Sequence, residues 1–110
     1  MIIDQNENTT IITQENASVI ELVKKIETLY PKYKNNNIIV NLNTGTPISL
    51  EKIIEFLRLS NKHRSAKHSF VIVNEGIDVD KTPDEIIIVP TLQEAYDIIE
   101  MEDMERDLGF

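Results

Sequence analysis

Cysteine is absent from this chain of 110 residues, and only three residues are glycine. Without cysteine there is no disulfide framework, no thiol nucleophile and no thiolate metal site, which is compatible with a reducing compartment. Three glycines leave no glycine-rich loop that cradles phosphate, and the sequence has neither a nucleophile elbow nor a histidine-rich metallohydrolase motif. We therefore predict that the protein is not an enzyme and needs no cofactor.

Basic residues are also scarce, since 11 lysines and arginines face 19 aspartates and glutamates for a formal net charge of −8. That charge disfavours long-range attraction to nucleic acid and to anionic membranes. No apolar run approaches a membrane-spanning length, and the N-terminal segment MIIDQNENTT lacks the basic region and apolar core of a signal peptide. We expect a cytoplasmic protein, away from membranes, whose partner is another protein or a small ligand.

Hydrophobic residues make up 41% and charged residues 27% of the chain, values typical of a globular protein with one core. Strand-like and helix-like patterns alternate along it. Strands are expected at residues 1–4 and 10–13, either as a hairpin or as a loose end before one strand, and at 38–42, 70–73 and 86–89, and helices at 16–33, 49–67 and 91–108. The prediction is a single α/β domain, residues 1–110, with a mixed sheet of four to five strands and about three main helices packed on it.

Two segments bear on the topology of this sheet. The Ile-Ile-Val run within 38–42 suits a strand buried on both faces, which favours a parallel neighbour. Residues 74–85 are too few for the usual helical crossover between parallel strands. Either a single helical turn bridges the last two strands, or they meet differently.

Each predicted helix opens on a residue whose hydroxyl can accept a hydrogen bond from a first-turn amide: Ser18, Ser49 and Thr91. Pro31 should end the first helix, because proline removes a backbone donor. The second helix is expected to bury a stripe of four apolar residues: Leu50, Ile53, Ile54 and Leu57. Gly109 should stop the last helix in the left-handed conformation, with Phe110 folded back on Met104.

The last predicted helix carries two apolar faces and most of the negative charge. One face comprises Leu92, Ala95, Tyr96 and Ile99, and the other comprises Ile98, Met101, Met104 and Leu108. Seven carboxylates against the single Arg106 give this helix six of the eight net negative charges. Because one sheet cannot bury both faces, the second is either a docking surface for a partner or an intramolecular packing surface.

Basic residues gather at the end of the second predicted helix. His63 and His68 are the only histidines, and no third ligand lies at a spacing that suits zinc, so we predict no metal site. Three cations of the 62–68 basic patch are candidates for RNA contact: Lys62, Arg64 and Lys67. A solvated helix end, stabilised by the helix dipole, explains the same cluster.

The order of strand, turn-rich loop, serine-initiated helix, strand, strand and VPTLQEA helix resembles a STAS domain over residues 38–100. The closing segment IIIVPTLQEAYDIIE carries most of this resemblance, followed by NIIVNL and SFVIV in the family's order. STAS domains form the fold of bacterial anti-sigma-factor antagonists. The resemblance therefore implies a bacterial regulatory module whose partner is an anti-sigma kinase-like protein.

In that family a Ser or Thr at the start of the helix after the strand is phosphorylated, which switches partner binding off. The resemblance places Ser49 at this position. The family's Asp-Ser-Ser-Gly signature is absent, and TPIS stands at 46–49 instead.

Two functions follow as hypotheses. The first is a non-catalytic cytosolic protein-interaction module that resembles anti-sigma-factor antagonists and is switched by phosphorylation at Ser49. Its candidate partner-binding residues are Ile98, Met101, Met104 and Leu108. The alternative is an accessory subunit of an RNA-processing enzyme that contacts RNA through the 62–68 basic patch. In either case we expect a monomer or a weak dimer.

Overall fold

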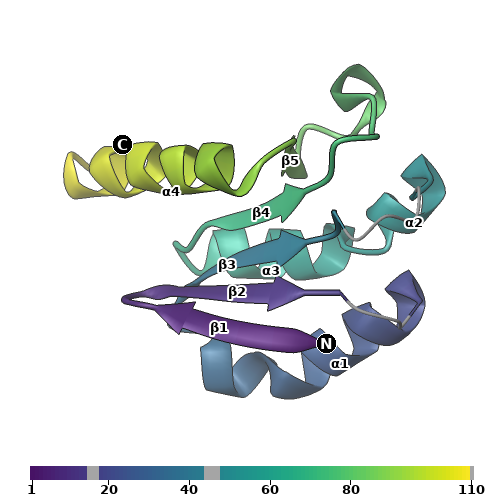
Figure 1. Ribbon diagram of the computed structural model, residues 1–110. Coiled ribbons are helices and arrows are strands. Elements are labelled where there is room, and N and C mark those ends of the chain that lie inside the picture. Colours follow the sequence, from purple (N-terminus) through teal and green to yellow (C-terminus); the bar gives the residue numbers. More distant parts are fainter. Residues whose placement is uncertain (15–17, 44–47, 110) are drawn as a thin grey trace.

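The computed structural model describes residues 1–14, 18–43 and 48–109, and five strands within these ranges form one mixed sheet (Figure 1). The strands are β1 (Ile2–Asn6), β2 (Thr9–Thr13), β3 (Asn37–Asn41), β4 (Phe70–Val73) and β5 (Ile87–Val89). Their spatial order follows the chain. β1 and β2 form an antiparallel hairpin, whereas β2 to β5 run parallel. The α/β class, the mixed sheet and the parallel neighbours of β3 are as predicted.

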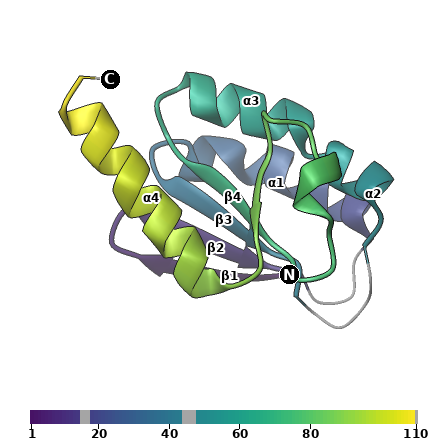
Figure 2. The same ribbon diagram turned by 90° about the horizontal axis from the view of Figure 1, so that it is seen from above.

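The described ranges also contain four α-helices and one 3-10 turn. They are α1 (Val19–Tyr33), α2 (Leu50–Ile54), α3 (Leu57–Ser65), η1 (Val79–Lys81) and α4 (Leu92–Asp107). The single turn η1 bridges β4 and β5, which confirms the first of the two predicted alternatives. Figure 2 shows α1, α2 and α3 on one face of the sheet and α4 on the other. No helix within the described ranges is long and apolar enough to cross a membrane.

Alternating strand side chains supply two hydrophobic cores, one on each face of the sheet. In β3, Ile38 and Val40 belong to the larger core under α1, α2 and α3, and Ile39 belongs to the smaller core under α4. All three are buried, as expected for a strand covered on both faces. The smaller core is closed by Ala95 and Ile99 of α4.

α1 begins at its predicted N-cap and runs past Pro31. The Ser18 hydroxyl accepts a hydrogen bond from the Glu21 amide at 3.2 Å, as the capping-box pattern predicts. The prediction that Pro31 ends the helix is wrong, because the helix continues to Tyr33. A proline this close to the end removes only one backbone bond. Burial of Tyr33 in the larger core stabilises the last residues as helix.

The prediction of one continuous helix at 49–67 is wrong, because the segment breaks into α2 and α3. At the break the amides of Glu55 and Phe56 bond carbonyls three residues back, at 3.2 and 3.0 Å, which is the tighter 3-10 pattern. Phe56 enters the larger core, and Ile54, predicted as buried, is exposed. The buried residues of this segment are Ile53, Phe56, Leu59, Ser60 and His63.

Candidate functional site

α4 has well-defined ends. The Thr91 hydroxyl accepts a hydrogen bond from the Glu94 amide at 3.2 Å, which is the cap that this spacing predicts. At the other end Gly109 has a left-handed φ of 83°, also as predicted. The predicted contact of Phe110 with Met104 lies outside the described residues.

The first half of α4 packs on the sheet. Ala95 and Ile99 are buried against strands β3, β4 and β5. Ile98 is half-buried and packs against the same core, so it is not part of the outward apolar face to which the helical wheel assigns it. Leu92, assigned to the sheet-facing side, is exposed. A helical wheel does not show which part of a helix the sheet covers, so it does not predict either position.

The second half of α4 is attached to the domain by polar contacts. Arg64, near the end of α3, donates a hydrogen bond to Glu102, with 3.2 Å between Nη1 and Oε2. Arg106 pairs with Asp103 and donates to the Ser69 hydroxyl at 3.0 Å, just before β4. These contacts all lie on the domain-facing side of α4. The opposite side of the helix therefore faces away from the domain.

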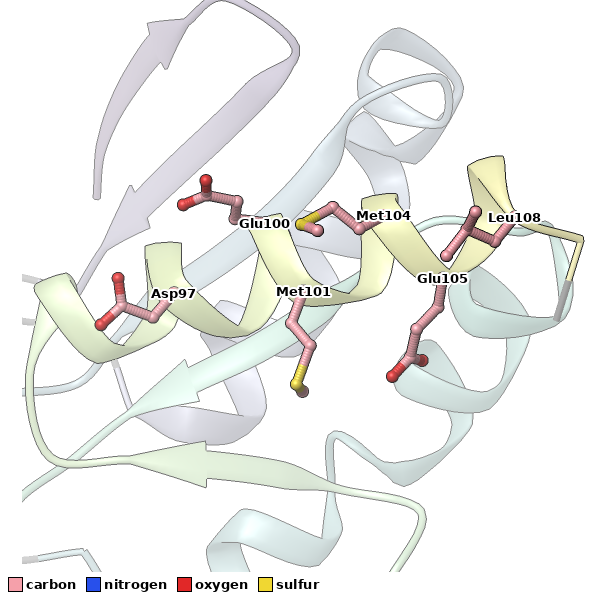
Figure 3. A pocket seen from close by; sticks show the side chains of 6 residues that line it. All are labelled: Asp97, Glu100, Met101, Met104, Glu105 and Leu108. Carbon is pink, nitrogen blue, oxygen red and sulfur yellow. The ribbon is translucent and has the colours of Figure 1, made fainter.

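Six side chains on that opposite side form the candidate docking surface, which we call the α4 surface: Asp97, Glu100, Met101, Met104, Glu105 and Leu108 (Figure 3). Met101, Met104 and Leu108 are 50%, 59% and 70% exposed, which is high for large apolar side chains. For these three the docking alternative is favoured over intramolecular packing. Because all six side chains come from one helix, they line a shallow surface and enclose no substrate.

A groove of about 360 Å³ runs beside α4, next to the turn of the β1–β2 hairpin. Residues 6–9 form one side of it, and α4 forms the other with side chains that include Tyr96 and Ile99. Glu100 and Met104 line both this groove and the α4 surface. The sequence did not predict the groove, because nothing in the hairpin turn indicates that it lies beside the last helix of the chain.

The cations of the 62–68 basic patch have separate surroundings. The Lys62 ammonium lies 4.7 Å from the centroid of the Tyr30 ring, a cation–π contact. Arg64 pairs with Glu102. Lys67 is exposed and has a left-handed φ of 69° just after α3. Two of the three candidate RNA-contacting residues are therefore engaged within the chain.

His63, in the same segment, is completely buried. Its Nε2 lies 2.7 Å from the carbonyl oxygen of Asn36, and its Nδ1 lies 2.7 Å from the Tyr30 hydroxyl. Because a carbonyl oxygen only accepts, Nε2 carries the proton and Nδ1 accepts from Tyr30. The pKa of His63 is lowered to about 4, chiefly by burial and to a lesser degree by the charges of His68 and Arg106, and the bond to Asn36 opposes this shift. His63 is therefore a neutral packing residue at neutral pH.

Neither histidine is part of a metal site among the described residues. His68 stacks on His63 with 5.3 Å between the ring centroids. Within the described ranges, no group of three or more His, Cys, Asp or Glu side chains is arranged to hold a metal ion.

Ser49 directly precedes α2, as predicted, but its hydroxyl makes no capping hydrogen bond. The predicted cap is wrong because the Ser49 carbonyl already accepts the amides of Lys52 and Ile53, at 3.1 and 3.2 Å, and so satisfies the amide that the hydroxyl would bind. The Ser49 side chain is exposed. Residues 44–47, which include the Thr-Pro pair of the TPIS segment, lie outside the described residues.

The chain fits no model of a known protein family, and no curated protein sequence matches it. The similarity of residues 38–100 to a STAS domain therefore stays a prediction. The features that bear on function are the α4 surface, the exposed Ser49 and the 62–68 basic patch.

Proposed function

We propose that this protein is a non-catalytic protein-interaction module with a regulatory role, and that its α4 surface binds the partner. The observation that carries this proposal is the exposure of Met101, Met104 and Leu108 on one side of a helix whose other side is fixed to the domain. Removing apolar side chains from water is the main source of affinity in protein association. The polar contacts of Arg64 and Arg106 hold the helix in place, so the surface is presented to a partner without rearrangement.

The size of this surface indicates a transient interaction. Complete burial of one Met or Leu side chain contributes about 1.5–3 kcal/mol. Because Met101, Met104 and Leu108 are 50–70% exposed, covering all three would contribute about 4 kcal/mol in total. Association itself costs about as much as this or more. Charged groups at the rim must therefore add to the affinity and select the partner.

The resemblance to STAS domains supports the regulatory part of the proposal, with a cytoplasmic, anti-sigma kinase-like protein as the partner. The same resemblance implies that Ser49 is a phosphorylation site. The Ser49 side chain is exposed, so a kinase can reach its hydroxyl. A phosphate adds nearly two negative charges at α2, on the face of the sheet opposite α4. If the partner also contacts the start of α2, as the resemblance implies, Ser49→Asp should weaken partner capture while Ser49→Ala does not. Equal capture by both variants would contradict the switch.

The experiment for the α4 surface is affinity purification of the whole chain from its native host, followed by mass spectrometry. Met101→Asp and Met104→Asp should each lose the partner without a change in melting temperature. Ile20→Asp is the matched control, because Ile20 is a large apolar residue, 41% exposed, on the opposite face of the sheet in α1. The proposal is wrong if the α4 variants melt at a lower temperature yet recover the partner in full.

The alternative is RNA contact through the 62–68 basic patch in an accessory subunit of an RNA-processing enzyme. The exposed Lys67 is available for it, whereas Lys62 and Arg64 would have to leave Tyr30 and Glu102. RNA binding that weakens with salt and is lost on Arg64→Ala would favour this alternative.

A further inference from the structure

The apolar residues of the α4 surface have the spacing of a coiled-coil seam. Met101, Met104 and Leu108 correspond to successive a, d and a positions of a heptad. The b, c and f positions lie on the opposite side of the helix and hold the residues that attach it to the domain: Glu102, Asp103 and Arg106. The heptad register and the polar contacts therefore agree on which side of α4 faces outward.

The positions that flank this seam are acidic. Glu100 and Asp107 occupy g positions, Glu105 occupies the e position between them, and all three are exposed. Within the described part of the chain, none of the three forms an ion pair. In a coiled coil the e and g charges determine which helix can bind, because opposite charges attract across the seam and like charges repel. The uncompensated carboxylates therefore indicate the charge of the partner.

Charge distinguishes between the occupants that an exposed apolar helix face can have. A second copy of this chain would bring the same acidic flanks together, and each copy carries a net charge of −8. An anionic membrane would be repelled by the same groups. A small molecule would find only one wall, because the α4 surface belongs to a single helix. A positively charged helix satisfies both the apolar seam and its acidic flanks.

We infer that the α4 surface binds one amphipathic, basic helix of a partner protein, with apolar residues at its a and d positions and Lys or Arg at e and g. This inference rests on the proposed function and specifies the chemistry of the partner. The groove beside the hairpin extends the contact, since Glu7 and Glu100 both line it and place carboxylates on two sides of the docked helix. From Met101 to Leu108 the seam is about 11 Å long, little more than one heptad, so binding is weak and rapidly reversible.

Synthetic peptides test the partner chemistry directly. The probe is a peptide of about three heptads with Leu at a and d and Lys at e and g, and the comparison peptide has Glu at e and g. Each is added to the whole ¹⁵N-labelled chain, and amide chemical shifts are followed by NMR. The lysine peptide should shift the amides of residues 97–108 and should lose affinity as salt is raised. The glutamate peptide should leave these amides unchanged.

Charge reversal provides the matched control. The double substitution Glu100→Lys/Glu105→Lys should lower the affinity for the lysine peptide roughly tenfold and should allow the glutamate peptide to bind. Glu51→Lys/Glu55→Lys changes the net charge equally, but at α2 on the opposite face, and should leave the preference for the lysine peptide intact. Equal binding of both peptides to the unaltered chain would overturn the inference. Amide shifts of residues 97–108 that depend on protein concentration without any peptide would also overturn it, because they would identify a second copy of the chain as the occupant.

The two proposals fail in different ways. If Met101→Asp loses the native partner while the peptides bind without regard to charge, the basic-helix inference alone is overturned. If Met101→Asp retains the native partner, the proposed function is overturned.

Discussion

Arg64 of α3 and Glu102 of α4 join two helices that lie on opposite faces of the sheet, with 3.2 Å between Nη1 and Oε2. Only 14% of the Glu102 side chain is exposed, and its second oxygen is buried without a hydrogen-bond partner among the described residues. A buried carboxylate is destabilising unless a positive charge lies beside it. Arg64 therefore stabilises the second half of α4 and the direction in which the α4 surface points.

Arg64→Ala should lower the free energy of unfolding by about 1–2 kcal/mol, between the values typical of exposed and of buried ion pairs. Arg58→Ala is the matched control, because Arg58 is exposed on the same helix, and it should change the stability by less than about 0.5 kcal/mol. Urea denaturation followed by circular dichroism measures both. If the two substitutions have equal effects, the contact with Glu102 adds nothing to stability.

Ile99 and Met104 test the orientation of α4 in a second way. Ile99 is 5% exposed against the sheet, whereas Met104 faces outward. Ile99→Ala should lower the free energy of unfolding by about 2–4 kcal/mol through the cavity it leaves, and Met104→Ala should change it by less than about 0.5 kcal/mol. Chemical denaturation of the two variants under the same conditions checks this. A large loss for Met104→Ala would mean that the α4 surface is buried within the domain.

The local sequence pattern was sufficient to predict much of this fold. The strand at Phe70–Val73 has its predicted bounds, and the caps at Ser18 and Thr91 form as their spacing predicts. Each of these features depends on residues close together in the chain. The outward position of Met101 and Met104 was one of the two alternatives that the sequence left open, because two apolar faces on one helix cannot both meet one sheet.

The features that the sequence did not predict depend on distant contacts. Ile98 packs inward because the sheet extends far enough to meet it, and that extent is set by strands elsewhere in the chain. The break before α3 lies at Glu55 and Phe56, whose amides bond carbonyls three residues back, and no glycine or proline between residues 49 and 67 indicates it. Arg64 and His63 belong to a basic cluster by sequence, yet their partners Glu102 and Tyr30 lie in other helices.

Ser49 and Thr91 occupy the same position before their helices but use their hydroxyls differently. Thr91→Ala should lower the free energy of unfolding by about 1 kcal/mol, because it removes the bond to the Glu94 amide. Ser49→Ala should lower it by clearly less, because its hydroxyl makes no such bond. Thermal unfolding of the two variants compares them. An equal loss in both would show that Ser49 caps α2 in solution.

The neutral His63 should make the protein less stable as the pH falls below neutrality. Its pKa is about 4 in the folded chain and about 6.5 in an unfolded one, so below pH 6.5 the unfolded chain binds a proton that the folded chain does not. Stability is therefore full above about pH 6.5 and is lost as the pH falls toward 4. Between pH 7 and pH 5 the loss from this residue is about 2 kcal/mol.

Glutamine at position 63 is the appropriate probe of this loss, because it keeps a donor and an acceptor but does not titrate. His63→Gln should lower the free energy of unfolding at pH 7, because the new side chain does not fit between Tyr30 and Asn36. The further decrease of this free energy from pH 7 to pH 5 should be about 2 kcal/mol smaller than in the unaltered chain. His68→Gln, in the neighbouring stacked ring, should keep most of the acid-induced loss, because burial is the larger cause of the lowered pKa of His63. Urea denaturation at the two pH values gives these differences directly. An unchanged pH dependence in His63→Gln would show that the pKa of His63 is not lowered on folding, because the Tyr30 hydroxyl can also accept a hydrogen bond from a protonated ring.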